Sequence, residues 1–493
     1  MTELLTTQEM YEADRRTIAS GVAGDILMQH AGAVVMQAIV QNWSPRPAAI
    51  LCGPGNNGGD GFVIARLLRE KGWPVRLGLL GSIADLQGDA ALNAERWGGP
   101  VELPSPALLV GAELVVDCLF GAGLARDIDG DAATLIEAVN NAGLPVVAVD
   151  IPSGVDGNSG DVRGIAIHAD LTVTFCRAKP GHYLLPGRER CGRLVVADIG
   201  IADDVIAAIG PQVMLNHPDV WRDAICWPAM AGHKYQRGHV LALGGTQTTG
   251  AIRLSTRGAR RVGAGLLTVI ADPAVLALYA ADAPGVMTAP TSQYEDMLQD
   301  CRHNAIVIGP GCGIGDETRW KVIHALRSCR ACVLDADALI SFAEDSSALF
   351  FAIQGPTILT PHEGEFSRLF PDIAGDKINR ARAAAKRSGA TIVLKGADTV
   401  IAAPDGRARI NAADAPWLAT AGSGDVLAGM IAGLLAQGMN MFDAASMAVW
   451  LHGEAGQKFG PGLIAEDIPE MLPGLLSGLF RSGGKSRFFG PIA

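Results

Sequence analysis

The sequence predicts an α/β protein made of two domains. Short apolar stretches alternate with segments of helical character along most of the chain, which favours largely parallel sheets covered by helices. The 493 residues exceed the size of one ordinary domain. The 61 glycines are scattered among the apolar stretches, which is typical of folds with many tight turns between strands and helices.

The composition indicates which classes of ligand to expect and in which cellular compartment the protein is found. Lys and Arg number 40 and Asp and Glu number 51, so the net charge is −11, and without a basic tract we expect no nucleic-acid binding. The first residues include acids and no apolar signal-peptide core, and the apolar segment 425–443 is interrupted by glycines. We therefore expect a cytoplasmic protein that does not cross a membrane, and we further expect a homo-oligomer.

The first predicted domain spans residues 1–215 and resembles a Rossmann-like α/β/α sandwich in its alternation of strands and helices. The pattern lapses over 201–235, where prolines and tryptophans replace regular periodicity, so the second domain is placed at 220–493. The strands expected in the first domain are 48–53, 74–81, 113–121, 145–154, 170–176 and 193–200, with helices over 8–42, 61–71 and 131–142. Those expected in the second are 239–245, 266–272, 305–311, 332–339, 356–362, 391–396 and 399–406, followed by a helical segment within 420–438.

Residues 50–61, ILCGPGNNGGDG, match the G-x-G-x-x-G pattern of a dinucleotide-binding turn. A cofactor-binding turn of this kind needs an acid about 20 residues later, at the end of the second strand. The strand 74–81 offers no acid there, whereas Asn56, Asn57 and Asp60 supply polar side chains inside the turn itself. We interpret 56–60 as a loop that meets phosphates through its amides and offers coordinating groups to a ligand. A plain glycine turn is the alternative.

Two further strand ends carry similar polar groups. Asp117 and Asp150 each end a predicted strand, and Ser153 follows Asp150 closely. Because the carboxyl ends of parallel strands meet at one edge of a sheet, these side chains and Asn57 are expected to converge. Their oxygen atoms suit a hard cation or a proton-transfer site. A single aspartate at a strand end is more often a helix cap.

The motifs LMQHAG, GPGNNGGDG, DCLFGAGLAR and VAVDIPSGVDG, in this order and spacing, resemble the NAD(P)HX epimerase domain. That family interconverts the R and S hydrates of NADH and NADPH. The resemblance implies that Asn57, Asp117 and Ser153 bind K⁺, and it makes Asp150 the candidate catalytic acid or base. The residues that it places against the hydrated dinucleotide are Asn56, Asn57, Gly58, Gly59, Asp60, Gly121, Ala122, Gly123, Leu124, Ala125, Arg126, Asp127 and Asp150.

The strongest feature of the second half is TAGSGDVLAGMIAGLL. Its glycines and Ser423 form a turn with free amides at the start of an apolar helix, where phosphate binds well, and Asp425 lies in the first turn, close enough to act as a base. The alternative is small residues for tight helix packing, which explains Gly429 and Gly433 better than GSGD. His362 and Lys395 follow other strands, and either one alone is more often structural or solvated.

The motifs HKYQRGHVLALGG, RRVGAGLLTV, LDADAL, LTPHEGEF, LKGADTVIA and ATAGSGDVLAG resemble the ADP- or ATP-dependent NAD(P)HX dehydratases of the ribokinase-like superfamily. The resemblance implies phosphorylation of the S hydrate, loss of phosphate to restore NAD(P)H, and Asp425 as the base. It places Gly424 and Lys395, Gly396, Ala397, Asp398 and Thr399 at the nucleotide, and Ala251, Gly313, His362 and Asp425 at the hydrate. Mg²⁺ is the expected metal.

One position departs from this family: Gly285 stands where a Glu is expected, which puts a local substrate contact in doubt. The sequence leaves open whether ADP or ATP is the donor and whether NADH or NADPH hydrate is preferred. The alternative function is a ribokinase-like vitamin or sugar kinase with a non-catalytic N-terminal binding domain.

Overall fold

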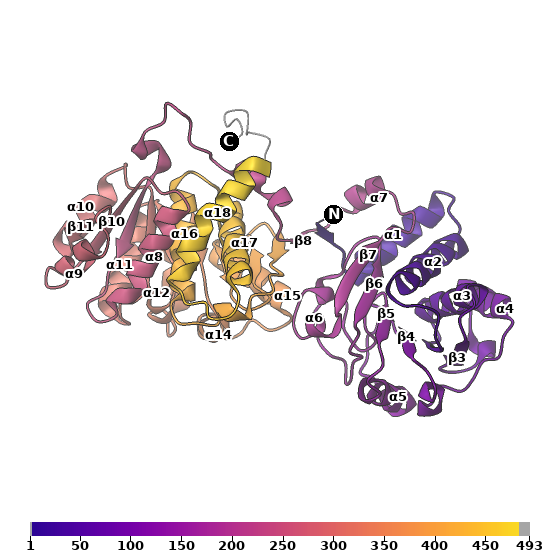
Figure 1. Ribbon diagram of the computed structural model, residues 1–493. Helices are drawn as coiled ribbons and strands as arrows, with labels where there is room; N and C mark the ends of the chain where they lie inside the picture. Colours follow the sequence, from indigo (N-terminus) through magenta and orange to yellow (C-terminus); the bar gives the residue numbers. More distant parts are fainter. Residues whose placement is uncertain (1, 483–493) are drawn as a thin grey trace. The chain divides into compact units, whose positions relative to one another are not determined.

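The computed structural model describes residues 2–482, so residues 483–493 of the second predicted domain lie outside the described part. The chain divides into two compact units, Glu3–Met214 and the residues from Leu215 onward (Figure 1). Each unit is built on a sheet of mainly parallel strands with helices packed against it. The predicted α/β class is therefore confirmed.

The sheet of the first unit has six parallel strands in the order β3-β2-β4-β5-β6-β7. A short antiparallel pair joins β1 to β8. The strands are β1 (Glu3–Leu4), β2 (Ala48–Cys52), β3 (Val75–Leu79), β4 (Leu114–Cys118), β5 (Val146–Val149), β6 (Leu171–Phe175), β7 (Arg193–Ala197) and β8 (Val213–Leu215). The helices are α1 (Thr7–Ala19), α2 (Gly24–Asn42), α3 (Asn56–Glu70), α4 (Gly88–Trp97), α5 (Gly130–Asn141), α6 (Gly187–Arg190) and α7 (Asp203–Ile209).

Alternating side chains of this sheet enter two different cores. Ile50 and Cys52 of β2 pack with apolar residues of α2 and α3, whereas Leu51 packs with residues of α5 on the opposite face. Successive strand residues point to opposite sides, so strands buried on both faces must be apolar throughout. This explains the uninterrupted apolar stretch AAILC of β2.

The strand order reverses between β2 and β4. The chain passes from β2 to β3 on one side and then returns to place β4 on the other side of β2. Loops that leave such neighbouring strands in opposite directions open a crevice at the carboxyl ends, where α/β sheets bind ligands. The turns after β2, β4 and β5 therefore surround one site.

In the second unit, strands β9 to β15 are joined in parallel in the order β15-β14-β13-β12-β9-β10-β11. Strand β16 extends the sheet antiparallel to β15, and β17 pairs antiparallel to β16. The strands are β9 (His239–Leu243), β10 (Leu266–Ala271), β11 (Met287–Pro290), β12 (Ala305–Ile308), β13 (Ala331–Leu334), β14 (Thr357–Leu359), β15 (Thr391–Leu394), β16 (Val400–Ala402) and β17 (Ala408–Ile410). The helices are α8 (Thr249–Arg261), α9 (Leu276–Asp282), α10 (Tyr294–Gln299), α11 (Asp316–Arg327), α12 (Asp337–Ile340), α13 (Ser346–Ala352), α14 (Glu363–Leu369), α15 (Lys377–Ser388), α16 (Ser423–Ala436), α17 (Met441–Phe459) and α18 (Asp467–Ser482).

Helix α16 is buried on nearly every side, between the sheet and the helices α8, α17 and α18. Glycines allow the close approach of α8 and α16. A Cβ on Gly433 would lie 2.5 Å from the carbonyl oxygen of Ala259, and one on Gly258 would lie 2.6 Å from that of Val426. Ser255 on α8 also donates a hydrogen bond to the backbone oxygen of Asp425 at 2.7 Å, which fixes the first turn of α16.

Several predicted segments differ in the structure: the helical segment 8–42 is divided into α1 and α2, and the predicted strand 145–154 ends at Val149. The sequence places a loop at 56–60 and a helix from 61, but α3 already begins at Asn56. Glycine is a poor helix former, so local propensity predicts a loop, whereas packing requires glycine here. A Cβ on Gly61 would lie 2.6 Å from Cys52 Sγ, and one on Gly58 would collide with the carbonyl oxygen of Gly53. The predicted strand 332–339 ends at Leu334 and is followed by α12.

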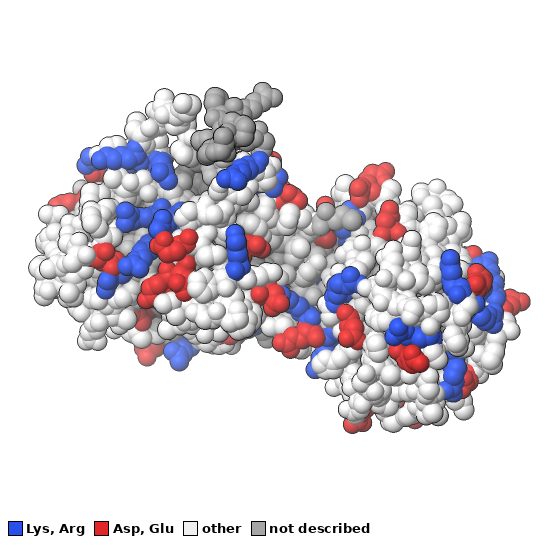
Figure 2. Space-filling model, in the orientation of Figure 1, with Lys and Arg blue, Asp and Glu red and all other residues white. Residues whose placement is uncertain are grey.

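On the face of the molecule shown in Figure 2, acidic and basic side chains are interspersed over both units. Within residues 2–482, no helix is both long and apolar enough to cross a membrane.

Two candidate functional sites

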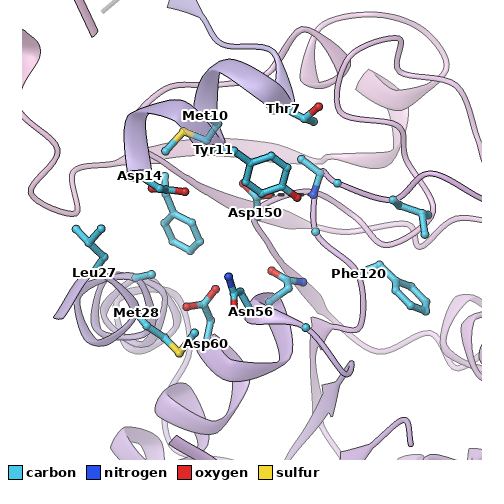
Figure 3. A pocket seen from close by; sticks show the side chains of 18 of the residues that line it. Thr7, Met10, Tyr11, Asp14, Leu27, Met28, Asn56, Asp60, Phe120 and Asp150 are labelled. Carbon is cyan, nitrogen blue, oxygen red and sulfur yellow. Dashed lines mark hydrogen bonds between the residues drawn. The ribbon is translucent and has the colours of Figure 1, made fainter. Parts of the chain in front are cut away.

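A cavity of about 600 Å³ lies at the carboxyl ends of β2, β4 and β5 in the first unit. Helices α1 and α2 and the start of α3 form its other walls (Figure 3). Of the residues expected at the hydrated dinucleotide, those that line it are Asn56, Asn57, Asp60, Gly121, Ala122, Gly123, Leu124, Ala125, Arg126 and Asp150. Gly58 and Gly59 instead pack beneath it, against Gly53 and Met28. Asp127 lines a second cavity of about 270 Å³, which shares Arg126 with the first.

Asp150 is held rigidly at the wall of this cavity. Its Oδ1 lies 2.5 Å from Lys179 Nζ and accepts a hydrogen bond from Thr174 at 3.0 Å, and its Oδ2 accepts one from the Ala122 amide at 3.0 Å. His182 Nε2 lies 2.8 Å from the backbone oxygen of Asp150. Burial acts to raise the pKa of Asp150, but the charge and hydrogen bond of Lys179 outweigh it and lower the pKa to about 2.

The backbone of Asp150 is also constrained, with φ of 66° in the left-handed region that non-glycine residues rarely adopt. Strain of this kind persists where surrounding contacts hold it, and it is common at functional sites. The contacts that hold it here are the four bonds to Lys179, Thr174, Ala122 and His182.

Asp117 and Ser153 form a hydrogen-bonded pair behind the cavity wall. Ser153 Oγ donates to Asp117 Oδ1 at 2.6 Å, and the Ser153 amide donates to Oδ2 at 2.8 Å. Burial raises the pKa of the Asp117 carboxyl to about 6, against the lowering effect of these bonds. Asn57 and Asp150 flank Gly121, since a Cβ there would lie 3.5 Å from Asn57 Cβ and 3.3 Å from Asp150 Oδ2.

The amide nitrogen of Asn57 is buried without a hydrogen-bond partner. The nitrogen and oxygen of a side-chain amide exchange places by a half-turn, so the same position can present an unused oxygen. With Asp117 and Ser153 nearby, the available donors are then all oxygen atoms, which suits a hard cation. Within residues 2–482, no cluster of three or more His, Cys, Asp and Glu side chains forms a ready metal site.

Sequence reasoning missed three side chains of this cavity: Tyr11, Asp14 and Lys179. Tyr11 and Asp14 project from α1, one helical turn apart, beside Met10 (Figure 3). Two polar residues on the same face as a buried Met are the signal that would have found them. Lys179 is only 2% exposed and follows β6, and a lysine soon after a central strand is a comparable signal.

In the second unit, side chains from successive strand ends meet at the start of α16. Asp425 lies in the first turn, after Gly422 with φ of 88°. Burial raises the pKa of Asp425 to about 6, and the nearby charges of Asp335, Asp337 and Glu365 add to this effect while Lys395 opposes it. Such a carboxyl exchanges protons near neutral pH.

Lys395 provides the positive charge of this group. Its Nζ lies 2.7 Å from Asp335 Oδ1 and 3.9 Å from Glu365 Oε2. Burial acts to lower the pKa of Lys395, but Asp335 and Glu365 outweigh it and raise the pKa above its ordinary value. A Cβ on Gly424 would lie 3.4 Å from Lys395 Nζ, so the lysine faces the glycine turn. An ammonium and free amides together suit phosphate.

The other predicted residues lie around this group. The amide of Gly313 donates to Asp337 at 2.8 Å, and His362 caps α14 by accepting from the amides of Gly364 and Glu365. Thr399 closes the 396–399 turn through bonds with the backbone of Gly396, and Asp398 pairs with Lys377. Ala251 packs beside Gly311, the glycine turn after β12.

Sequence reasoning did not assign Asp335 and Glu365 to the site. Asp335 is 1% exposed and immediately follows β13. An acidic residue directly after an apolar strand, as in CVLDAD, is the available signal. Its partner Lys395 follows a strand two places along the sheet, so only the sheet order shows that the two charges meet.

Comparison with known proteins matches both units. A family model described as NAD(P)H-hydrate dehydratase matches residues 240–473, and one described as YjeF-related protein N-terminus matches 24–181. The bifunctional NAD(P)H-hydrate repair enzyme Nnr of Moorella thermoacetica is 36% identical, with 97% of each chain covered. That of Coxiella burnetii is 35% identical over 95% of this chain and 98% of the relative. The crystal structure of an ADP/ATP-dependent NAD(P)H-hydrate dehydratase from Bacillus subtilis, with ATP and Mg²⁺, is 28% identical over 54% of this chain and 98% of its own, with a TM-score of 0.48. On this full-length similarity, the chain belongs to the family of bifunctional NAD(P)H-hydrate repair enzymes.

Proposed function

We propose that this chain repairs hydrated NADH and NADPH. The first unit interconverts the R and S hydrates, and the second unit uses ADP or ATP to convert the S hydrate to NAD(P)H. The observation that carries the proposal is that one chain holds both matched units over almost the full length of its relatives. A dehydratase restricted to the S hydrate would leave the R hydrate unrepaired, so the two activities complement each other.

The first cavity supports the epimerase role. Its volume of about 600 Å³ is in the range of pockets that hold small ligands. The amides at the start of α3 favour an anionic group such as a diphosphate, and Asp150, paired with Lys179, lies close to Asn57 of the same helix start. We assign substrate binding to the lining residues of 56–60 and 121–127 and to Asp150, which the sequence predicted as the acid or base of the site. With its pKa near 2, Asp150 is ionised and accepts hydrogen bonds from the substrate.

K⁺ is proposed as the cation of the first unit, held by Asn57, Asp117 and Ser153. The orphaned amide of Asn57 and the all-oxygen donor set support this assignment. A monovalent cation there would neutralise the buried Asp117 carboxylate and anchor the 117–121 turn, which forms part of the cavity wall.

In the second unit we propose Asp425 as the base that takes the proton of the hydrate hydroxyl as it attacks the terminal phosphate. We assign Gly424 and residues 395–399 to nucleotide binding, and Ala251, Gly313 and His362 to hydrate binding. Lys395 would neutralise charge on the transferred group. The carboxylates around Asp425 fit Mg²⁺, because this ion is usually held by one or two carboxylates together with substrate phosphates. Bound there, Mg²⁺ supplies charge neutralisation.

The proposal is tested by incubating the purified protein with separated R and S hydrates, with and without ADP or ATP, and following the absorbance of reduced nicotinamide. We expect both hydrates to be repaired with a nucleotide. Asp150→Ala should leave S-hydrate repair intact and stop R-hydrate repair, whereas Asp425→Ala should stop both while epimerisation continues. If neither nucleotide restores NADH, the proposal is wrong; a stable phosphorylated product would instead identify a kinase.

Cytoplasmic location and homo-oligomerisation stay predictions.

A further inference from the structure

Four carboxyl groups line the cavity of the first unit, those of Asp14, Asp60, Asp89 and Asp150, and their surroundings differ. Asp150 is tied to Lys179, Thr174 and Ala122. By contrast, within residues 2–482 no side chain or backbone group forms a hydrogen bond or an ion pair with the carboxyl groups of Asp14 and Asp60. Asp60 is nevertheless 8% exposed, and Asp14 is half-buried. Buried carboxyl groups normally have partners, so two without any at one cavity point to a ligand.

The two carboxyl groups enter the cavity from different elements. Asp14 projects from α1, and Asp60 projects from the second turn of α3 on the other side of the space (Figure 3). Each is carried by a helix, which gives a defined direction to its side chain. A planar ring bound between α1 and α3 would therefore face one carboxyl on each side.

The surroundings of the Asp14 and Asp60 carboxyl groups also raise the pKa of both. Burial raises the pKa of Asp60 well above its ordinary value, and the charges of Asp150 and Asp14 add to the effect. Burial raises the pKa of Asp14 to about 6, with Lys179 lowering it and Asp150 raising it. The other titratable groups facing Asp14 are Tyr11 and Cys176. Both pKa values are therefore raised toward the range in which a carboxyl group exchanges protons near neutral pH, as acid–base catalysis needs.

We propose that Asp14 and Asp60 are the acid–base pair that inverts the hydrate carbon, one serving each face of the ring. This rests on the epimerase function proposed above. Hydration of the ring's enamine double bond leaves the hydroxyl on the carbon bonded to the ring nitrogen. A group that gives a proton to this hydroxyl on one face, and another that takes a proton from water on the other face, are sufficient for inversion.

The step is balanced as follows for one direction. The Asp60 carboxylic acid transfers its proton to the hydroxyl, the C–O bond breaks with its electron pair leaving on oxygen as water, and the ring nitrogen lone pair forms a C=N⁺ bond. A water molecule on the opposite face then forms a new C–O bond while the Asp14 carboxylate takes its proton, and the C=N⁺ electrons return to nitrogen. The pair ends with its proton on Asp14, ready for the reverse direction.

Asp14→Asn tests the proposal in the full-length protein. The R-to-S inversion is followed by separating the hydrates over time, and S-hydrate dehydration is measured in the same preparation. We expect inversion to fall by about 100-fold or more in kcat with little change in KM, and dehydration to stay unchanged. Asp60→Asn should give the same result. Glu12→Gln is the matched control, since Glu12 lies on α1 but pairs with Arg15 and Arg16 outside the cavity.

Two further readouts separate chemistry from a structural role. Wild-type inversion should fall as the pH drops through about 6, where Asp14 takes up a proton. Inversion in ¹⁸O-labelled water should place one labelled oxygen in each inverted hydrate. Inversion without uptake of ¹⁸O, or an inversion rate of Asp14→Asn within a few-fold of wild type, would overturn the proposed acid–base pair. Wild-type protein that does not invert the hydrates at all would instead overturn the epimerase function.

Discussion

The substitution Gly433→Ala tests whether the glycines of α16 allow it to pack closely against α8. A Cβ at this position would lie 2.5 Å from Ala259 O, 2.6 Å from Val262 Cγ2 and 2.8 Å from Ala259 Cα. Ordinary contacts begin near 3.4 Å, and two of these three atoms belong to the α8 backbone. Gly433→Ala therefore forces α8 and α16 apart by roughly 0.9 Å at this point.

The expected change in the free energy of unfolding follows from two opposing effects. Overpacking of a close-packed core costs about 1–3 kcal/mol, whereas replacing glycine by alanine inside a helix gains about 1 kcal/mol. Gly478 on α18 supplies the matched control, because it is exposed and a Cβ there meets nothing within 4 Å. Gly478→Ala should show the gain alone, so the two variants should differ by about 1–3 kcal/mol in the free energy of unfolding.

Hydrogen exchange read by mass spectrometry measures this difference within the second unit, with peptides of β2 to β5 as an internal reference. We expect peptides of α16 and α8 to exchange about 5–30-fold faster in Gly433→Ala than in Gly478→Ala, the factor for 1–2 kcal/mol. S-hydrate dehydration should also fall, because α16 carries Asp425. Equal stabilisation by both substitutions would refute the packing argument.

Four further predictions concern ligands and pH. Asn57→Ala should abolish the effect of K⁺ on epimerisation and on the thermal unfolding of the first unit; an unchanged response to K⁺ would contradict the cation site. Dehydration should slow as the pH falls through about 6, where Asp425 takes up a proton and can no longer act as a base. Lys395→Met removes the charge that lowers the pKa of Asp425, so the acidic limb of the pH–rate profile for dehydration should move to higher pH. An acidic limb at an unchanged pH would exclude Asp425 as the group that titrates there. Gly285→Glu places a carboxylate beside the flexible end of Arg260, so we expect a change in stability of no more than about 1 kcal/mol and a lower KM for the S hydrate, both measured on the full chain.

Most of the fold could be predicted from periodicity. Uninterrupted apolar strands alternating with helices indicate parallel sheets because only strands buried on both faces lack polar residues. The short strands β1, β8, β11 and β17 escaped prediction, since two to four residues carry too little pattern to separate from loop. The start of α3 was wrong for a different reason: local propensity opposes a helix through Asn56–Gly61, and only contacts with Gly53, Cys52 and Met28 explain why glycines occur there.

For the site, the sequence by itself determined which strand ends carry chemistry, because a polar residue directly after an apolar strand is visible in one dimension. Asp117 at the end of β4 and Asp150 directly after β5 are of this kind, whereas Asp425 is visible as an acid that follows a glycine turn at the start of an apolar helix. Only the tertiary structure decided their partners: Lys179 reaches Asp150 from the end of the neighbouring strand β6, and Lys395 reaches Asp335 across the sheet. It also decided their acidity, because burial and neighbouring charges, which set a pKa, depend on how distant segments pack together.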